Sequence, residues 1–173
     1  MKCICIAGAS QPDLTSVSDI LQQAGMMLPK PGNRADFIDM NAWHEQALTL
    51  NTEEAIATPG RFMEQLAGDI FSANIKSSLW GWADTRSTWL LDFWLDFDPR
   101  LYFVLVYVSP EQMLANTIRS ETEIDSVDTV IEAWQAHNQH LLRFHLRNPE
   151  RSLLVDASEC VEDPHALIKR CAE

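Results

Sequence analysis

Long apolar runs are missing from this sequence. The apolar stretch Cys3–Ala9 is too short to cross a membrane, and no long basic region precedes it, as a signal peptide would require. We therefore expect a cytoplasmic protein with no membrane span and no secretion signal.

Basic side chains are scarce as well. The chain has 13 lysines and arginines against 25 aspartates and glutamates, which gives a net charge of −12. Because such a chain repels other polyanions, we expect no nonspecific binding to nucleic acid or to an anionic membrane surface. Any site for a highly charged anion would have to be assembled from few cations.

Cysteine is also sparse, and the four cysteines do not form a framework. Cys3 and Cys5 would point to the same side of a strand, and Cys160 and Cys171 lie far away in the sequence. Since no spacing is that of a known metal-ligand set, we expect reduced structural thiols and no bound metal.

What is present is the composition of a globular domain. A length of 173 residues with 46% hydrophobic residues suits one domain, over residues 1–173, with a sizeable core. Apolar runs alternate with segments of helical periodicity, which predicts a three-layer α/β domain with a mostly parallel sheet of about five strands. Strands are expected at 2–9, 36–39, 79–82, 101–108 and 152–156, and helices at about 15–24, 52–57, 61–75, 89–97, 110–120, 127–146 and 164–172.

The centre of the chain carries the most specific motifs. Gly81–Arg86 reads GWADTR, Leu91–Trp94 reads LDFW, and Phe103–Tyr107 reads FVLVY ahead of Pro110. This order of turn, helix and buried strand resembles the bacterial sulfotransferase-like family, in which a GW(K)DPRT turn precedes a helix and an FVLVYRDP strand follows it. The resemblance implies a P-loop sulfotransferase fold, with 3′-phosphoadenosine 5′-phosphosulfate as the donor if the protein is active.

The donor-binding loop of that family would follow the first strand. The family usually has GAPRSGTS there, and this chain has GASQPDLTS over Gly8–Ser16. The resemblance makes Gly8, Ser10, Thr15 and Ser16 candidate donor-binding residues, but the basic residue and the second glycine of the family pattern are missing.

Asp13 stands in this loop, close to the start of the next predicted helix. Its carboxylate can cap the free N–H groups of the helix, and it would repel a phosphate group at the same place. The loop is therefore either an anion site or a self-capped turn, and the residues favour the turn.

A second donor contact in the family reaches the 3′-phosphate. It comes from an arginine at the end of the central strand and a serine on the following helix, and the matching positions here are Val108 and Asn116. Asn116 can donate a hydrogen bond and is a further candidate donor-binding residue, whereas valine cannot. Each lost charge-assisted contact costs roughly 1.5–3 kcal/mol, so losing two weakens donor binding by on the order of a hundredfold to ten-thousandfold.

Asp84 and Arg86 follow a predicted parallel strand, at the edge where open α/β sheets bind ligands. Arg86 would hold an anionic group, and Asp84 would act as a base or orient Arg86, which makes both candidate catalytic residues. The alternative is a structural turn in which Asp84 caps the next helix and pairs with Arg86.

Three histidines, His137, His140 and His145, lie on the long helix predicted near the C-terminus. His137 and His140 are i,i+3 neighbours, so a metal pair is geometrically possible, but no acid or cysteine completes a site. We expect solvent-facing histidines or a polar cluster.

The segment Trp89–Phe97 is apolar almost all round its predicted helix. Such a helix is either buried within the domain, which the pattern favours, or covers a second copy of the chain or a protein partner.

These patterns favour a sulfotransferase-like protein with a degenerate donor site, a pseudoenzyme that binds a ligand or partner without catalysis. The alternative is an active small sulfotransferase that transfers the sulfuryl group to a sugar or another hydroxyl. A third possibility is a different nucleotide, acyl or sugar ligand, bound through Asp84, Arg86 and Arg119.

Overall fold

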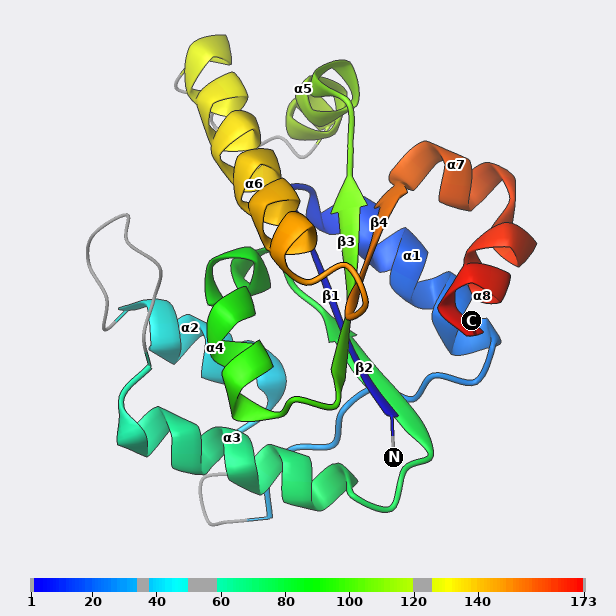
Figure 1. The fold of residues 1–173 in the computed structure, drawn as a ribbon. Helices are drawn as coiled ribbons and strands as arrows, with labels where there is room; N and C mark the ends of the chain where they lie inside the picture. Colours follow the sequence, from blue (N-terminus) through cyan, green and yellow to red (C-terminus); the bar gives the residue numbers. More distant parts are fainter. Residues whose placement is uncertain (1, 34–37, 50–58, 120–125, 173) are drawn as a thin grey trace.

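Four parallel strands form the central sheet of the computed structural model, which describes residues 2–33, 38–49, 59–119 and 126–172. β1 (Lys2–Gly8) lies between β2 (Leu79–Ala83) and β3 (Leu101–Tyr107), and β4 (Ser152–Asp156) flanks β3 (Figure 1). Every neighbouring pair is parallel, which confirms the predicted α/β architecture. The additional strand predicted at 36–39 falls largely outside the described residues.

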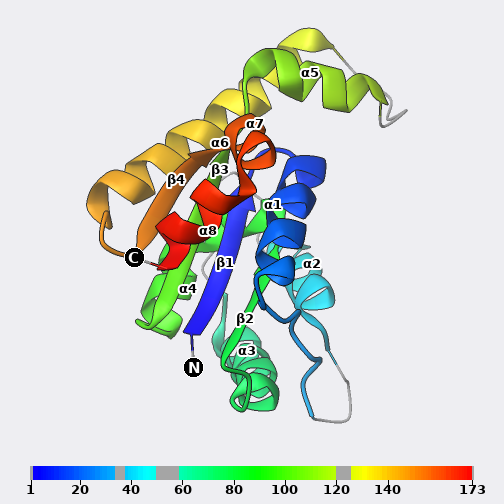
Figure 2. The ribbon, with the colours of Figure 1, turned by 90° about the vertical axis from the view of Figure 1, so that its right-hand side faces the viewer.

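Helices on both faces of the sheet complete the three layers. α1 (Gln11–Gln23), α7 (Ala157–Glu162) and α8 (Pro164–Ala172) cover one face (Figure 2). On this side the core is aliphatic, because alternate strand residues such as Ile6 and Val106 meet the apolar stripe of α1.

The other face carries a second group of helices. They are α2 (Met40–Thr49), α3 (Arg61–Asn74), the 3-10 helix η1 (Thr85–Leu90), α4 (Leu91–Phe97) and α6 (Val127–Arg147) (Figure 1). α5 (Pro110–Arg119) follows β3 and packs on α6 beyond the carboxyl end of the sheet.

The core under these helices is aromatic and explains the apolar segment Trp89–Phe97. Trp94 is fully buried, with its ring 4.5 Å from that of Trp43 and 4.9 Å from that of Trp82. Phe93 stacks on Trp43 at 5.4 Å. The predicted burial of this segment within the domain is therefore confirmed, and a partner on its outer side stays a prediction.

Several predicted boundaries need correction. α1 begins at Gln11 rather than near residue 15, because Pro12 and Asp13 belong to its first turn, where proline and an acidic residue are both favourable. The helix predicted at 89–97 is instead two elements, since Leu90 has φ −117° and ψ 9° and separates η1 from α4. α2 and α7 are additional helices, and the helix predicted at 52–57 lies outside the described residues.

The cysteines are free thiols, as predicted. Cys3 and Cys5 lie in β1 and are buried, and burial raises the pKa of both thiols. Within the described residues, no helix is both long enough and apolar enough to cross a bilayer.

Candidate functional site

The connection from β1 to α1 is very short. Gly8 ends the strand, and only Ala9 and Ser10 separate it from the first residue of α1, Gln11. A Cβ atom on Gly8 would lie 2.6 Å from the carbonyl oxygen of Val106. Close packing of β1 on β3 therefore accounts for this glycine without any ligand.

The Asp13 carboxylate occupies the entrance of this connection. Its Oδ2 atom accepts a hydrogen bond from the Ser10 hydroxyl and another, 2.6 Å long, from Nδ2 of Asn116. Asn116 Nδ2 also lies 3.0 Å from Ser10 Oγ. The fold thus brings two predicted donor-binding residues together from α5 and the β1–α1 connection, but it brings them together around a negative charge.

Two further predicted donor-binding residues, Thr15 and Ser16, point elsewhere. Thr15 donates its hydroxyl to the carbonyl of Gln11 at 2.9 Å, and Ser16 donates to that of Pro12 at 3.1 Å. Both hydroxyls are bonded along α1 itself, so the structure does not gather them with Ser10 and Asn116.

Asp84 and Arg86 form a tight pair at the carboxyl end of β2. Asp84 Oδ1 accepts from the backbone N–H of Arg86 at 2.8 Å and from Nε at 2.9 Å, while Oδ2 accepts from Nη2 at 2.6 Å. Nη2 also donates to Asn41 Oδ1 at 2.6 Å. Burial opposes ionisation of Asp84, but these bonds and the positive charge of Arg86 outweigh it and hold its pKa below the usual value.

The same geometry recurs at Asp98 and Arg100. Asp98 Oδ1 accepts from the Arg100 N–H at 2.9 Å and from Nε at 3.0 Å, and Oδ2 accepts from Nη2 at 2.9 Å. Because this second pair precedes β3, at the opposite edge of the sheet, the Asp-x-Arg arrangement is a local turn structure. The first pair therefore has the predicted capping geometry, and any further role depends on its surroundings.

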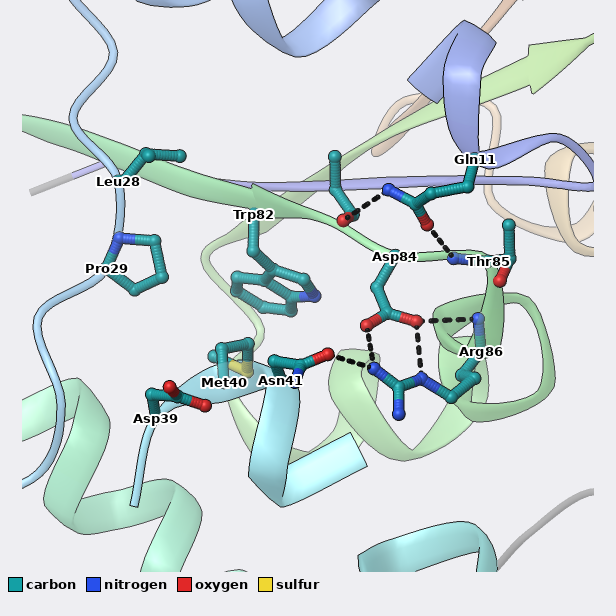
Figure 3. Close-up of a pocket in the computed structure, with 11 residues that line it drawn as sticks. Gln11, Leu28, Pro29, Asp39, Met40, Asn41, Trp82, Asp84, Thr85 and Arg86 are labelled. Carbon is teal, nitrogen blue, oxygen red and sulfur yellow. Dashed lines mark hydrogen bonds and ion pairs between the residues drawn. The ribbon is translucent and has the colours of Figure 1, made fainter. Parts of the chain in front are cut away.

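Those surroundings are a cavity of about 670 Å³ (Figure 3). Trp82, Met40, Leu28 and Pro29 form its apolar wall, and its polar lining consists of Gln11, Asp39, Asn41, Asp84, Thr85 and Arg86. The Gln11 side chain ties α1 to the turn, since its amide donates to the carbonyl of Ala83 and accepts from the N–H of Thr85. Arg119 does not line this cavity, so the structure does not gather it with Asp84 and Arg86.

A buried polar network behind the cavity was not predicted. His44 Nε2 lies 2.8 Å from Ser87 Oγ, and Ser87 Oγ accepts from Trp82 Nε1 at 3.0 Å. His44 Nδ1 is 2.7 Å from the carbonyl of Met40, which assigns the ring proton to Nδ1. Burial lowers the pKa of His44, so the ring is neutral.

This network is structural. Asp84 Oδ2 stands 3.9 Å from His44 Nδ1, so serine, histidine and aspartate follow one another as in hydrolases. Ser87 and His44 are, however, fully buried, and Nδ1 bonds to the helix backbone rather than to Asp84. No substrate can reach Ser87 in this arrangement. His44 could not be predicted from the sequence, because its segment has weak helical periodicity.

His137 and His140 of α6 are half-buried, so the first of the two expected alternatives, solvent-facing histidines, is wrong for them. They lie against η1, with the Trp89 ring 4.6 Å from that of His137 and 5.6 Å from that of His140. His137 Nδ1 and His140 Nε2 are buried without hydrogen-bond partners. His145 is separate and lies 2.8 Å from Ser152 Oγ. No cluster of three potential metal ligands occurs in the described part of the chain.

No known protein family and no curated protein match the sequence. Among solved structures, the sulfotransferase domain from the curacin biosynthetic pathway has a TM-score of 0.60 and 14% identity over 99% of this chain and 72% of that chain. The sulfotransferase domain of the Synechococcus PCC 7002 olefin synthase gives 0.61 and 12% over the same shares. Deoxyadenosine kinase from M. mycoides, solved with dATP, gives 0.53 and 14% over 99% of both chains.

Likeness at this level of identity shows the fold alone. The chain has the three-layer α/β fold of these sulfotransferase domains and of the deoxyadenosine kinase.

Proposed function

We propose that this chain is a sulfotransferase-like protein that does not bind the phosphosulfate donor and works as a non-catalytic binding protein. The observation that carries the proposal is the two-residue connection, Ala9 and Ser10, between β1 and α1. P-loops surround phosphate groups with successive backbone N–H groups from a longer glycine-rich loop. Here the residues from Gln11 to Ser16, which stand where such a loop would be, are already part of α1, and Pro12 has no N–H to offer.

The local charge supports the same proposal. The Asp13 carboxylate is held in place by Ser10 and Asn116, at the end of α1 where a phosphate would be bound. No lysine or arginine occurs between Lys2 and Lys30 to compensate it. A donor with several negative charges would meet repulsion where catalysis requires positive charge.

The cavity beside Arg86 supports a binding role and limits its ligand. Its volume of about 670 Å³ is within the usual range for small-molecule sites. Arg86 is paired with Asp84, and Asp39 adds a second carboxylate, so the lining carries one more negative than positive charge. We propose a neutral or cationic ligand that has an apolar surface for Trp82.

Two further parts of the proposal rest on sequence alone. One is a protein partner or a second copy of the chain on the outer side of Trp89–Phe97, and the other is a cytoplasmic location.

The test is calorimetric titration of the purified chain with 3′-phosphoadenosine 5′-phosphate, the product nucleotide. We expect no binding at millimolar nucleotide. Micromolar binding would contradict the proposal and favour an active small sulfotransferase, for which hydroxyl acceptors would then be screened.

Two variants show which feature matters. Asp13→Asn removes the negative charge, and we expect it to leave the chain unable to bind nucleotide, because α1 still begins at Gln11. If Asp13→Asn binds, charge rather than the early start of α1 closes the site. Should the unaltered chain bind, Arg86→Ala tests whether the Asp84 turn takes part, with Arg100→Ala as the matched control because its pair has the same geometry.

A further inference from the structure

A second cavity, of about 590 Å³, lies at the amino ends of the strands, at the opposite edge of the sheet from the cavity beside Arg86. It opens between the C-terminal end of α1 and the helix α8, which flank β1 in Figure 2. Leu21 and Ala24 of α1 and Ile168 of α8 form its sides. Ile168 of α8 and Leu153 of β4 are half-buried there, and Ile4 and Val104 lie buried beneath the cavity.

The two-residue period of the strands gives this cavity a polarity gradient. Ile4, Val104 and Leu153 belong to the aliphatic face of the sheet and form the floor. Each of these residues is preceded, two positions earlier in the chain, by a polar or basic residue on the same face. These residues are Lys2, Tyr102 and Arg151. An apolar floor therefore ends in a polar, cationic mouth.

The mouth of the cavity is positively charged, whereas the molecule as a whole is negatively charged. Lys2, Arg151 and Arg170 line the cavity with one acid, Glu150, although the chain has a net charge of −12. None of the three cations forms an ion pair within the described residues. The charge of Arg151 helps to lower the pKa of Asp98, but the Asp98 carboxylate is paired with Arg100.

Two of these cations are held over the cavity. The Arg151 guanidinium carbon lies 5.3 Å from the centre of the Tyr102 ring, and Arg170 Nη2 donates to the carbonyl of Leu154 at 3.1 Å. Each guanidinium has further N–H groups with which to bind an anion, since arginine carries five. The mouth can therefore bind one anionic head group by charge-assisted hydrogen bonds.

We infer that this cavity binds a fatty carboxylate. The aliphatic chain would lie on Ile4, Val104 and Leu153, and the carboxylate would lie between Lys2 and the two arginines. The charge complementarity selects an anion, and the aliphatic floor selects an unbranched apolar body over a sugar or a nucleotide. The inference is independent of the function proposed for the other end of the sheet.

The test is calorimetric titration of the full chain with octanoate, decanoate and dodecanoate. We expect one equivalent to bind, with a Kd that falls about fourfold for each added methylene. Decanol and decylamine, which have the same chain length as decanoate without its negative charge, should bind at least about tenfold more weakly.

Variants locate the binding. Arg151→Gln and Lys2→Gln should each weaken decanoate binding about tenfold or more, because each removes a charge at the mouth. Arg61→Gln, which removes an exposed cation on α3, and Arg86→Ala, at the other cavity, should leave the Kd unchanged. The inference is overturned by no binding at millimolar decanoate, by equal binding of decanol, or by an equal effect of Arg61→Gln.

Discussion

His137 should make the folded state of this chain sensitive to mild acid. Burial, together with the nearby His140, lowers the pKa of His137 from an ordinary 6.5 to about 4. In the unfolded chain the ring takes up a proton below pH 6.5, and in the folded chain it does so only below about pH 4. The contribution of His137 to the free energy of unfolding is therefore fully present above pH 6.5 and is lost as the pH falls towards 4.

The magnitude follows from the two pKa values. A fall from 6.5 to about 4 corresponds to about 3 kcal/mol, of which about 2 kcal/mol is already lost at about pH 5. Burial also lowers the pKa of His44 and of His140. At His140 the charge of Asp92 opposes this effect, and the charges of Arg147 and Arg143 reinforce it. The whole protein therefore loses more free energy of unfolding than His137 alone accounts for.

The assay is urea unfolding followed by tryptophan fluorescence, at about pH 7.5 and about pH 5, for the unaltered chain and His137→Phe. We expect the variant to lose about 2 kcal/mol less between the two pH values, since phenylalanine cannot take up a proton. Asp84 and Asp98, whose pKa values are lowered, lose their contribution only as the pH falls below about 3.8, outside this interval. The control is His165→Phe, on the exposed side of α8.

An equal pH dependence in His137→Phe and the unaltered chain would refute the reasoning. It would mean that the ring meets water or a hydrogen-bond partner in solution, and the burial of its Nδ1 atom would then have no energetic consequence.

Three substitutions test the packing around the candidate site, each by urea unfolding. Gly8→Ala should cost about 1–3 kcal/mol, because its Cβ would lie 2.6 Å from a carbonyl oxygen of β3, and an unchanged stability would show that the strands can separate. Ser87→Ala should cost about 1–3 kcal/mol, since it leaves His44 Nε2 buried without its partner, and a neutral effect would place water there. Trp94→Ala should cost about 3–5 kcal/mol, whereas Phe62→Ala, at an exposed position, should cost little; similar costs would contradict the assigned core.

The strands could be predicted because a parallel sheet with helices on both faces needs apolar residues on both faces of each strand. β4 and α8 match their predicted limits, at Ser152–Asp156 and Pro164–Ala172. Both have sharp signals: an apolar run before an aspartate for the strand, and a proline at the first helical position for the helix.

The start of α1 could not be predicted because two structures share its signals. Pro12 and Asp13 are as favourable in a loop as in the first turn of a helix, so the sequence permits either a phosphate-binding loop or a longer α1. Tertiary contacts decide between them, and Asn116, which holds Asp13 from α5, lies 103 residues away. The pairing of His44 with Ser87 is equally nonlocal, and a buried histidine interrupts the apolar pattern by which α2 would have been recognised.

The short passage from β1 into α1 also determines how this protein could change over evolution. The stretch Gly8–Ser16 has nine residues, one more than the GAPRSGTS pattern it resembles, so a gain of donor binding needs no added length. It needs the first turn of α1 to unwind, because Gln11, Pro12 and Asp13 are helical here. Glycine and a basic residue in that turn would favour a loop and attract a phosphate group. The separation between an enzyme and a binding protein on this scaffold is therefore set by where α1 begins, and a gain of activity should appear in related genomes as substitutions within residues 10–14 rather than as an insertion after Gly8.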